Sequence, residues 1–166
     1  GFTLIELLLY FGLVALFLTA ATLSTLDIIL GNVKSSVQQE VQENLRYAAH
    51  RIQFEARNAD AIDAPQSSFG VNLATNPALI VSLSVTTTHN PTEFRVSGGT
   101  LQIKRGSGGW TALTSGAVEV TNLTFVDLSD PSSENIRFTV TVKYRNPSGR
   151  QQWEKETTFE GAANLR

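Results

Sequence analysis

The sequence predicts an α+β fold, in which one long N-terminal α-helix packs its C-terminal half on an antiparallel β-sheet domain. An uncharged run from Leu7 to Leu26 stands near the start of the chain, and apolar residues at helical spacing continue to about Asn58. After about residue 79, a two-residue alternation of apolar and polar residues replaces that spacing. We therefore divide the chain into an apolar helix half (1–30), an amphipathic helix half (31–59) and a β-sheet head domain (60–166).

The apolar helix half is long enough to cross a membrane. Its uncharged run of about 20 residues corresponds to about 30 Å of helix, which is the thickness of the hydrocarbon core of a bilayer. Hydroxyl groups at Thr19, Thr22, Ser24 and Thr25 can bond to carbonyl groups one turn earlier, so they do not interrupt a membrane helix. A secretory signal peptide is a weaker interpretation, because the helical pattern continues past this run. A plain membrane anchor leaves the carboxylate of Glu6 unexplained.

The amphipathic helix half has one apolar face, which recurs every three or four residues. This face consists of Val33, Val37, Val41, Leu45, Ala49 and Ile52, and the polar face carries Lys34, Gln38, Glu40, Gln42, Glu43 and Arg46. No proline precedes Pro65, so we expect one helix from about Thr3 to about Asn58, over about 80 Å long. Its first half must lie in lipid or against other subunits, whereas the second can cover a sheet.

The head domain reads as a loop-like segment, 60–78, followed by strands of one antiparallel sheet. The strand candidates are Leu79–Thr86, Glu93–Val96, Thr100–Lys104, Trp110–Leu113, Val118–Leu128, Asn135–Arg145 and Gln151–Glu160. Glycine-rich stretches at 97–99 and 106–109 indicate tight turns, and Arg145–Arg150 reads as the turn of the longest hairpin. The apolar face of that hairpin requires a cover, which we expect the amphipathic helix half to provide.

Composition and motifs argue against an enzyme and against a cofactor. The chain has no cysteine, and its formal net charge is -2. Neither His50 nor His89 has an acidic partner or nucleophile at a motif spacing. The carboxylates in Asp127–Glu134 are either a solvated turn or a calcium loop, although their spacing matches no calcium motif. We expect no metal site, and we expect Trp110 and Trp153 to lie in the sheet core.

The first thirty residues carry a specific motif: Gly, Phe, Thr, Leu, Ile and Glu, followed by the apolar helix ("GFTLIELLLYFGLVALFL"). This stretch resembles the type IV pilin superfamily of pilins, minor pilins and type II secretion pseudopilins. The resemblance implies that a prepilin peptidase cleaves between Gly1 and Phe2 and that the amine of Phe2 is methylated. It also implies an assembly site at Phe2, Thr3 and Glu6, where Glu6 faces a neighbour's N-terminal amine and sets register. The chain departs from many pilins in lacking a proline about twenty residues into the helix.

The stretch Leu113–Ser129, followed by a long hairpin, is similar to the J-type minor pseudopilin and to related minor pilins. The resemblance implies a minor pilin or pseudopilin in the bacterial cytoplasmic membrane, with its head outside, that later joins an extracellular or periplasmic filament. The implied partners are other pilin subunits, the prepilin peptidase, and an assembly platform protein with its ATPase.

Two alternatives stay open: a major pilin, or a filament-borne binding module for DNA or a surface. Basic side chains on the predicted sheet could contact nucleic acid, although scattered cations are more often a solvated face. These side chains are Lys104, Arg105, Lys143, Arg145 and Arg150, of which the last three are the DNA-contact candidates.

Overall fold

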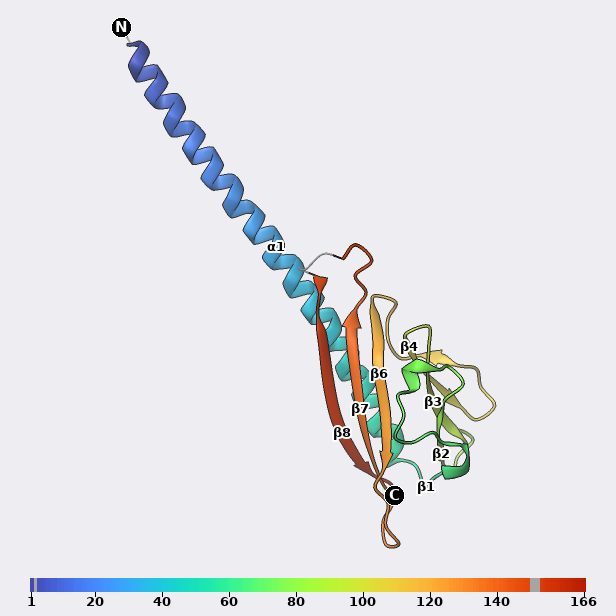
Figure 1. Cartoon of the computed structure of the whole chain (residues 1–166). Helices are drawn as coiled ribbons and strands as arrows, with labels where there is room; N and C mark the ends of the chain where they lie inside the picture. The colour runs from blue at the N-terminus through green and yellow to red at the C-terminus, as the bar shows by residue number, and fades with distance from the viewer. Residues whose placement is uncertain (2, 150–152) are drawn as a thin grey trace. The chain divides into compact units, whose positions relative to one another are not determined.

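The computed structural model describes Gly1, residues 3–149 and residues 153–166. These residues form two compact units, 1–36 and 37–166, and the helix α1 (Leu4–Arg57) runs through both (Figure 1). The predicted helix from Thr3 to Asn58 is confirmed to within one residue at each end. The boundary between the units falls after Ser36, within the amphipathic helix half.

The first unit is a single helical segment whose N-terminus is capped by Thr3. The backbone N–H of Glu6 lies 3.3 Å from Thr3 Oγ1 and 3.1 Å from the Thr3 carbonyl oxygen. Further along, the hydroxyl groups of Thr19, Thr22 and Thr25 donate to carbonyl oxygens four residues earlier, at 2.8, 2.8 and 2.9 Å. The predicted back-bonding is confirmed for these threonines, and it keeps their polar groups satisfied without breaking the helix.

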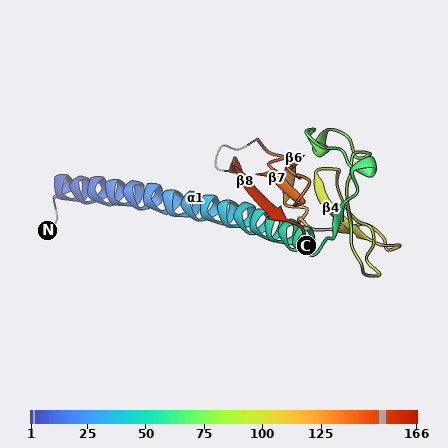
Figure 2. The same ribbon diagram turned by 90° about the horizontal axis from the view of Figure 1, so that it is seen from below.

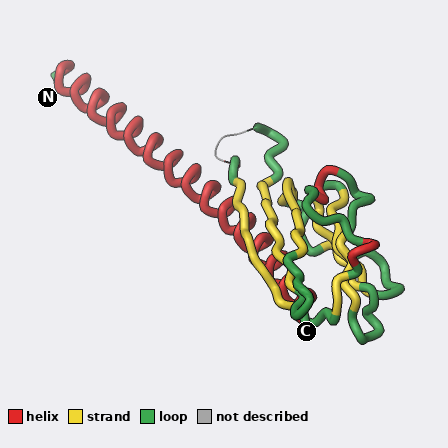
Figure 3. Tube along the Cα trace, turned by 60° about the horizontal axis from the view of Figure 1, so that its bottom comes forward, coloured by secondary structure: helices red, strands yellow, loops and turns green. Residues whose placement is uncertain are grey.

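The second unit contains the rest of α1, and the predicted apolar face is buried from Val37 onward, whereas Val33, in the first unit, is only half-buried. The buried side chains of this face are Val37, Val41, Leu45, Ala48, Ala49, Ile52 and Ala56. The opposite face is exposed at Gln42, Glu43 and Arg46. This part of α1 lies along one face of strands β6, β7 and β8, so the predicted cover of the hairpin is confirmed (Figures 1 and 3).

The head contains two antiparallel sheets, whereas the sequence predicted one. The first sheet has the order β1 (Ala61–Ile62), β2 (Val81–Ser84), β3 (Thr92–Ser97), β4 (Thr100–Arg105) and β5 (Thr111–Ala112). The second has the order β6 (Val118–Asp127), β7 (Asn135–Tyr144) and β8 (Glu156–Asn164), and two short 3₁₀ helices occupy Ala64–Gln66 and Leu73–Thr75. The sheets separate because the chain turns at Ser115, which hydrogen bonds to α1 rather than extending β5.

The last strand begins later than predicted. The sequence placed it at Gln151–Glu160, but β8 covers Glu156–Asn164 and pairs with β7 in unbroken register from Lys143↔Glu156 to Asn135↔Asn164. The pairing favours this register because Ala163 and Gly161 are small enough to lie opposite Ile136 and Phe138 under the helix. Residues of this kind give no alternating apolar signal, so the sequence pattern missed the end of the strand.

One hydrophobic core joins both sheets and the helix. The rings of Phe94, Phe125, Phe138 and Phe159 form a continuous series with neighbouring centroids 6.1 Å apart at each step. Phe94 comes from the five-stranded sheet and the others come from the three-stranded sheet. Aromatic pairs at this spacing add to the stabilisation from burial, so this series ties the two sheets into one head.

A bulge in β6 is held by Asn72, which lies in the segment predicted to be a loop. The register of β6 shifts between Val120 and Asn122, which leaves Thr121 unpaired with β7. The side chain of Asn72 donates to the Thr121 carbonyl at 3.0 Å and accepts from the Leu123 N–H at 3.0 Å. Asn72 therefore satisfies backbone groups on the outer edge of the bulged strand.

Candidate assembly site

The surface of the first unit is predominantly apolar from Leu4 to Leu30. Every apolar side chain from Leu4 to Leu30 is exposed, for example 79% at Leu4 and 72% at Phe17. The helix is long and apolar enough to cross a membrane by length and composition. An apolar surface of this size is far larger than soluble monomers expose, so it indicates a contact with lipid or with other helices.

Glu6 lies in the first turn of this apolar helix and is half-buried. With Thr3 as the N-cap residue, Glu6 occupies the third helical position, and the pair has the spacing of a capping box. The positive end of the helix dipole stabilises an anion at this position. The sequence analysis missed this local role, although the Thr-x-x-Glu spacing was available to find it.

The processing residues are described only in part. Gly1 is exposed at the end of the chain. Phe2, the predicted methylation site and partner of Glu6, lies outside the described residues. Cleavage and the contact between Glu6 and a neighbour's amine therefore stay predictions.

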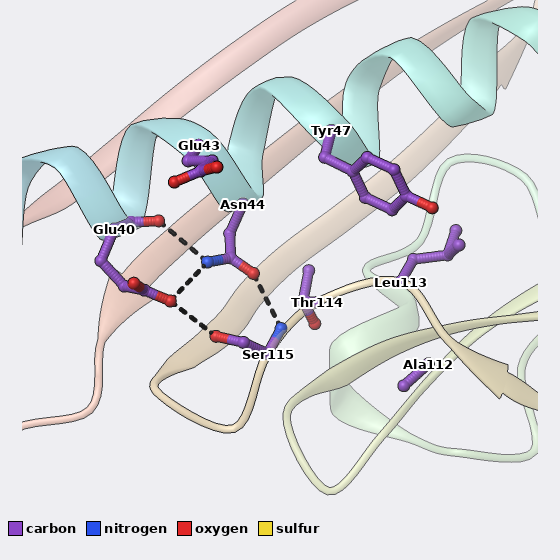
Figure 4. A pocket seen from close by; sticks show the side chains of 8 residues that line it. All are labelled: Glu40, Glu43, Asn44, Tyr47, Ala112, Leu113, Thr114 and Ser115. Carbon is purple, nitrogen blue, oxygen red and sulfur yellow. Dashed lines mark hydrogen bonds between the residues drawn. The ribbon is translucent and has the colours of Figure 1, made fainter.

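A polar cluster fastens the turn between β5 and β6 to α1 (Figure 4). The side chain of Asn44 donates to Glu40 Oε1 at 2.9 Å and accepts from the Ser115 N–H at 2.7 Å. The Ser115 hydroxyl completes the cluster by donating to Glu40 Oε1 at 2.9 Å. These groups line an open cavity of about 550 Å³, together with Glu43 and Tyr47. Because the hydrogen bonds run between the residues of the cluster, the arrangement positions the sheets on the helix.

A buried carboxylate forms the second polar link between helix and head. Glu55 is only 6% exposed, and its Oε1 lies 2.6 Å from Arg51 Nη2. Arg105 on β4 also forms an ion pair with this oxygen, and its Nε donates to it at 3.1 Å. Burial raises the pKa of Glu55, while the positive charges of Arg51 and His89 act in the opposite direction. The sequence analysis did not single out Glu55, because its contact with Arg105 spans fifty residues.

We expect the Glu55→Gln variant to change the pH dependence of head stability. Since the pKa of Glu55 is raised above 4.5 in the folded chain, its ionisation costs more in the folded state than in the unfolded state. Relative to Glu55→Gln, the wild-type free energy of unfolding should fall as pH rises from about 4.5 through the raised pKa. Urea unfolding of both proteins at a series of pH values between about pH 4 and pH 8 measures this difference in the free energy of unfolding. A difference that grows in favour of wild type over that window would contradict the prediction.

Three of the predicted basic side chains have polar partners in the described part of the head, and Lys143 is exposed beside two glutamates. Lys104 forms an ion pair with Glu93 at 2.8 Å, and Arg105 is paired with Glu55. Arg145 donates to the Gly98 carbonyl at 2.6 Å and to the Val118 carbonyl at 3.2 Å. Lys143 lies between Glu119 and Glu156 in the register of the sheet, and Arg150 lies outside the described residues. Positive and negative side chains therefore alternate here, and the basic candidates do not form a patch of one charge sign.

Neither tryptophan belongs to the buried core, so that prediction is wrong. Trp110 is half-buried, and its ring lies 4.0 Å from the guanidinium of Arg95 and 5.8 Å from Lys104 Nζ. The reason is that Arg95 and Lys104 are on the outward-facing side of β3 and β4, and the glycine-rich turn returns Trp110 to that side. Trp153 is also half-buried, with its ring edge-on to Tyr144 at 6.1 Å.

Carboxylates of the acidic loop 127–134 accept hydrogen bonds from backbone N–H groups of the head. Asp130 accepts from the Ser132 N–H at 2.7 Å and the Ser133 N–H at 2.9 Å, and Glu134 accepts from the Ile62 N–H at 2.6 Å. Hydrogen bonds from Ser132 and Ser133 lower the pKa of Asp130. Among the residues that the structure describes, no group of three or more histidine or acidic side chains is arranged to hold a metal ion. The two histidines, His50 and His89, are exposed and lie on different elements.

Comparison of the chain with models of known protein families, with curated proteins and with solved structures gave no match. The fold and the apolar helix define the class of protein. In the described residues, one helix is long and apolar enough to cross a membrane, and it continues into an α+β head.

Proposed function

We propose that this chain is a structural filament subunit, a minor pilin or pseudopilin of the type IV pilin superfamily, and not an enzyme. The observation that carries the proposal is the exposed apolar helix from Leu4 to Leu30, which carries the carboxylate of Glu6 in its first turn. Each large apolar side chain moved out of water contributes about 1.5–3 kcal/mol. The segment is therefore stable in lipid before assembly and against neighbouring helices afterwards.

Glu6 distinguishes a filament subunit from a plain anchor. A charged side chain in hydrocarbon costs several kcal/mol, so it is retained where it has a partner. A neighbour's N-terminal amine about 4 Å away would attract the carboxylate by about 4 kcal/mol at an effective dielectric constant of 20. Desolvation offsets much of this attraction, so the pair selects the axial register of the entering subunit more than it stabilises the filament.

The proposal includes the location and the partners. The chain waits in the bacterial cytoplasmic membrane with its head outside, after a prepilin peptidase has cleaved between Gly1 and Phe2. An ATPase and a platform protein then transfer it into a filament of related subunits. A DNA-binding role is less well supported, because Lys104, Arg105 and Arg145 have acidic or carbonyl partners. Lys143 also lies between two glutamates in the register of the sheet.

Quantitative mass spectrometry of sheared filaments and of membranes from the source cells tests this proposal. We expect a trace amount of this chain in the filament beside a more abundant subunit, and an N-terminal peptide that begins with methylated Phe2. A chain that dominates the filament would instead be the major pilin. An unprocessed N-terminus together with absence from every filament fraction would contradict the filament role.

A further inference from the structure

The outer edge of β8 differs from the other sheet edges in the described part of the head. The edges of the five-stranded sheet, β1 and β5, are each two residues long. The outer edge of β6 is covered by other segments: Gly70 donates to the Phe125 carbonyl at 2.8 Å, Val120 donates to the Gly99 carbonyl at 2.8 Å, and Asn72 fills the bulge. By contrast, β8 is nine residues long and is last in its sheet (Figure 1).

The register shows which backbone groups of β8 point to this free edge. Tyr144 donates to the Lys155 carbonyl at 2.9 Å, and Leu165 donates to the Glu134 carbonyl at 2.9 Å. Hydrogen-bonded pairs alternate along an antiparallel ladder, so the odd-numbered residues of β8 bond to β7. The even-numbered residues therefore direct their N–H and C=O groups outward. These residues are Glu156, Thr158, Glu160, Ala162 and Asn164.

A groove with an apolar floor runs beside this edge, between β8 and α1 within the second unit. Its volume is about 410 Å³, and its apolar lining is formed by Leu45, Ala49 and Phe159. Four polar side chains complete the lining, namely Gln42, Arg46, His50 and Gln53. Figure 2 shows β8 lying next to this stretch of the helix. Odd-numbered β8 side chains such as Phe159 face the helix, while even-numbered ones are exposed on the other face. A strand added to β8 would place alternate side chains over this apolar floor.

The exposed row of β8 is acidic and lacks the usual protection of an edge. Its even-numbered side chains include Glu156 and Glu160, and β8 contains neither lysine nor proline, the residues that commonly block edge pairing. On the inner side of this row, Glu160 forms an exposed ion pair with Arg137 at 3.5 Å, and Glu156 accepts from the Thr121 hydroxyl at 2.8 Å and lies opposite Lys143. Each carboxylate keeps acceptor capacity for a further donor on the outer side. An antiparallel second copy of β8 that places Glu156 opposite Glu160 would bring four carboxylates together, which disfavours that self-pairing. Basic side chains opposite Glu156 and Glu160 would instead form favourable cross-strand pairs.

We propose that the free edge of β8 is a strand-addition site for an extended segment of another protein, in which basic and apolar residues alternate. The apolar residues lie over Leu45, Ala49 and Phe159, and the basic residues lie opposite Glu156 and Glu160. The backbone hydrogen bonds come from the even-numbered residues, as in other cases of β-augmentation. The site belongs to the head alone, so it does not depend on the filament role.

The test uses the full chain in nonionic detergent micelles and a fluorescent peptide of alternating lysine and valine, about as long as β8. We expect the peptide to bind and to slow amide hydrogen exchange at Thr158, Glu160 and Ala162. The variant Thr158→Pro removes an outward N–H that β7 does not use, and it should weaken binding about tenfold, while Thr158→Ala should stay within about twofold. Glu160→Lys should weaken binding of this peptide and strengthen binding of a glutamate–valine peptide.

Unchanged exchange at Val140 and Val142 shows that Thr158→Pro still folds. Equal affinity of the wild type and of that folded variant would overturn the proposal. Protection of the same amides that rises with protein concentration and without peptide would also overturn it, since the occupant would then be a second copy. An affinity for the lysine–valine peptide that Glu160→Lys leaves unchanged would contradict the basic character of the partner. None of these results depends on whether the chain enters filaments.

Discussion

Replacing Glu6 with alanine is expected to remove the chain from sheared filaments and to leave it in the membrane. Under the proposed filament role, the apolar helix keeps its affinity for lipid, while the entering subunit loses the charge that we propose selects its register. An attraction of about 4 kcal/mol before desolvation corresponds to a reduction of incorporation of at least about tenfold. Immunoblots of the sheared filaments and of the membrane fraction measure the ratio of the two populations.

Asp27 provides the matched control, since it is the other acidic residue within the apolar segment and is exposed. Asp27→Ala should enter filaments at the wild-type level. Thr3→Ala removes the helix cap but not the charge, so it separates the local role of Glu6 from its role toward a neighbour. Incorporation of Glu6→Ala at the wild-type level would contradict the register role, and equal losses in Thr3→Ala and Glu6→Ala would assign the effect to capping.

Replacing Phe125 with alanine is expected to cause the largest loss of stability in the head. Phe125 is 1% exposed and its ring stands between those of Phe94 and Phe138, at 6.1 Å from each. The change leaves a cavity where the two sheets meet, and truncation of a buried phenylalanine typically costs about 3–5 kcal/mol. Urea unfolding followed by tryptophan fluorescence measures this loss, because Trp110 and Trp153 both belong to the head.

Phe54 provides the control for this experiment. It lies on the part of α1 that belongs to the head but is 49% exposed, with Arg51 over its ring at 5.2 Å. Phe54→Ala should cost less than about 1 kcal/mol, the range of an exposed cation–π contact. Similar losses for the two variants would show that the aromatic series does not join the sheets.

The long helix and most of the strands could be predicted from the sequence because their signals are local. Helical spacing of valines and leucines, together with the absence of proline before Pro65, placed α1 to within one residue at each end. Period-two alternation placed β3, β4, β6 and β7 closely, since each has one buried face. The motif at Gly1–Glu6 supports the assembly hypothesis, which awaits the measurements above.

The other features of the head depend on contacts between residues far apart in the sequence. In the sequence, Asn72 looks like an ordinary loop residue, and only the fold shows that it bonds to the bulge at Thr121. Glu55 likewise looks like part of a polar helix face, and only the fold shows its ion pair with Arg105. The division into two sheets follows from the hydrogen bonds of Ser115 to α1. The sequence by itself determined the long helix, most of the strands and their buried faces, because periodicity is a property of neighbouring residues. Only the tertiary structure decided strand register, the buried polar pairs and the free edge of β8, because these depend on which distant groups satisfy one another.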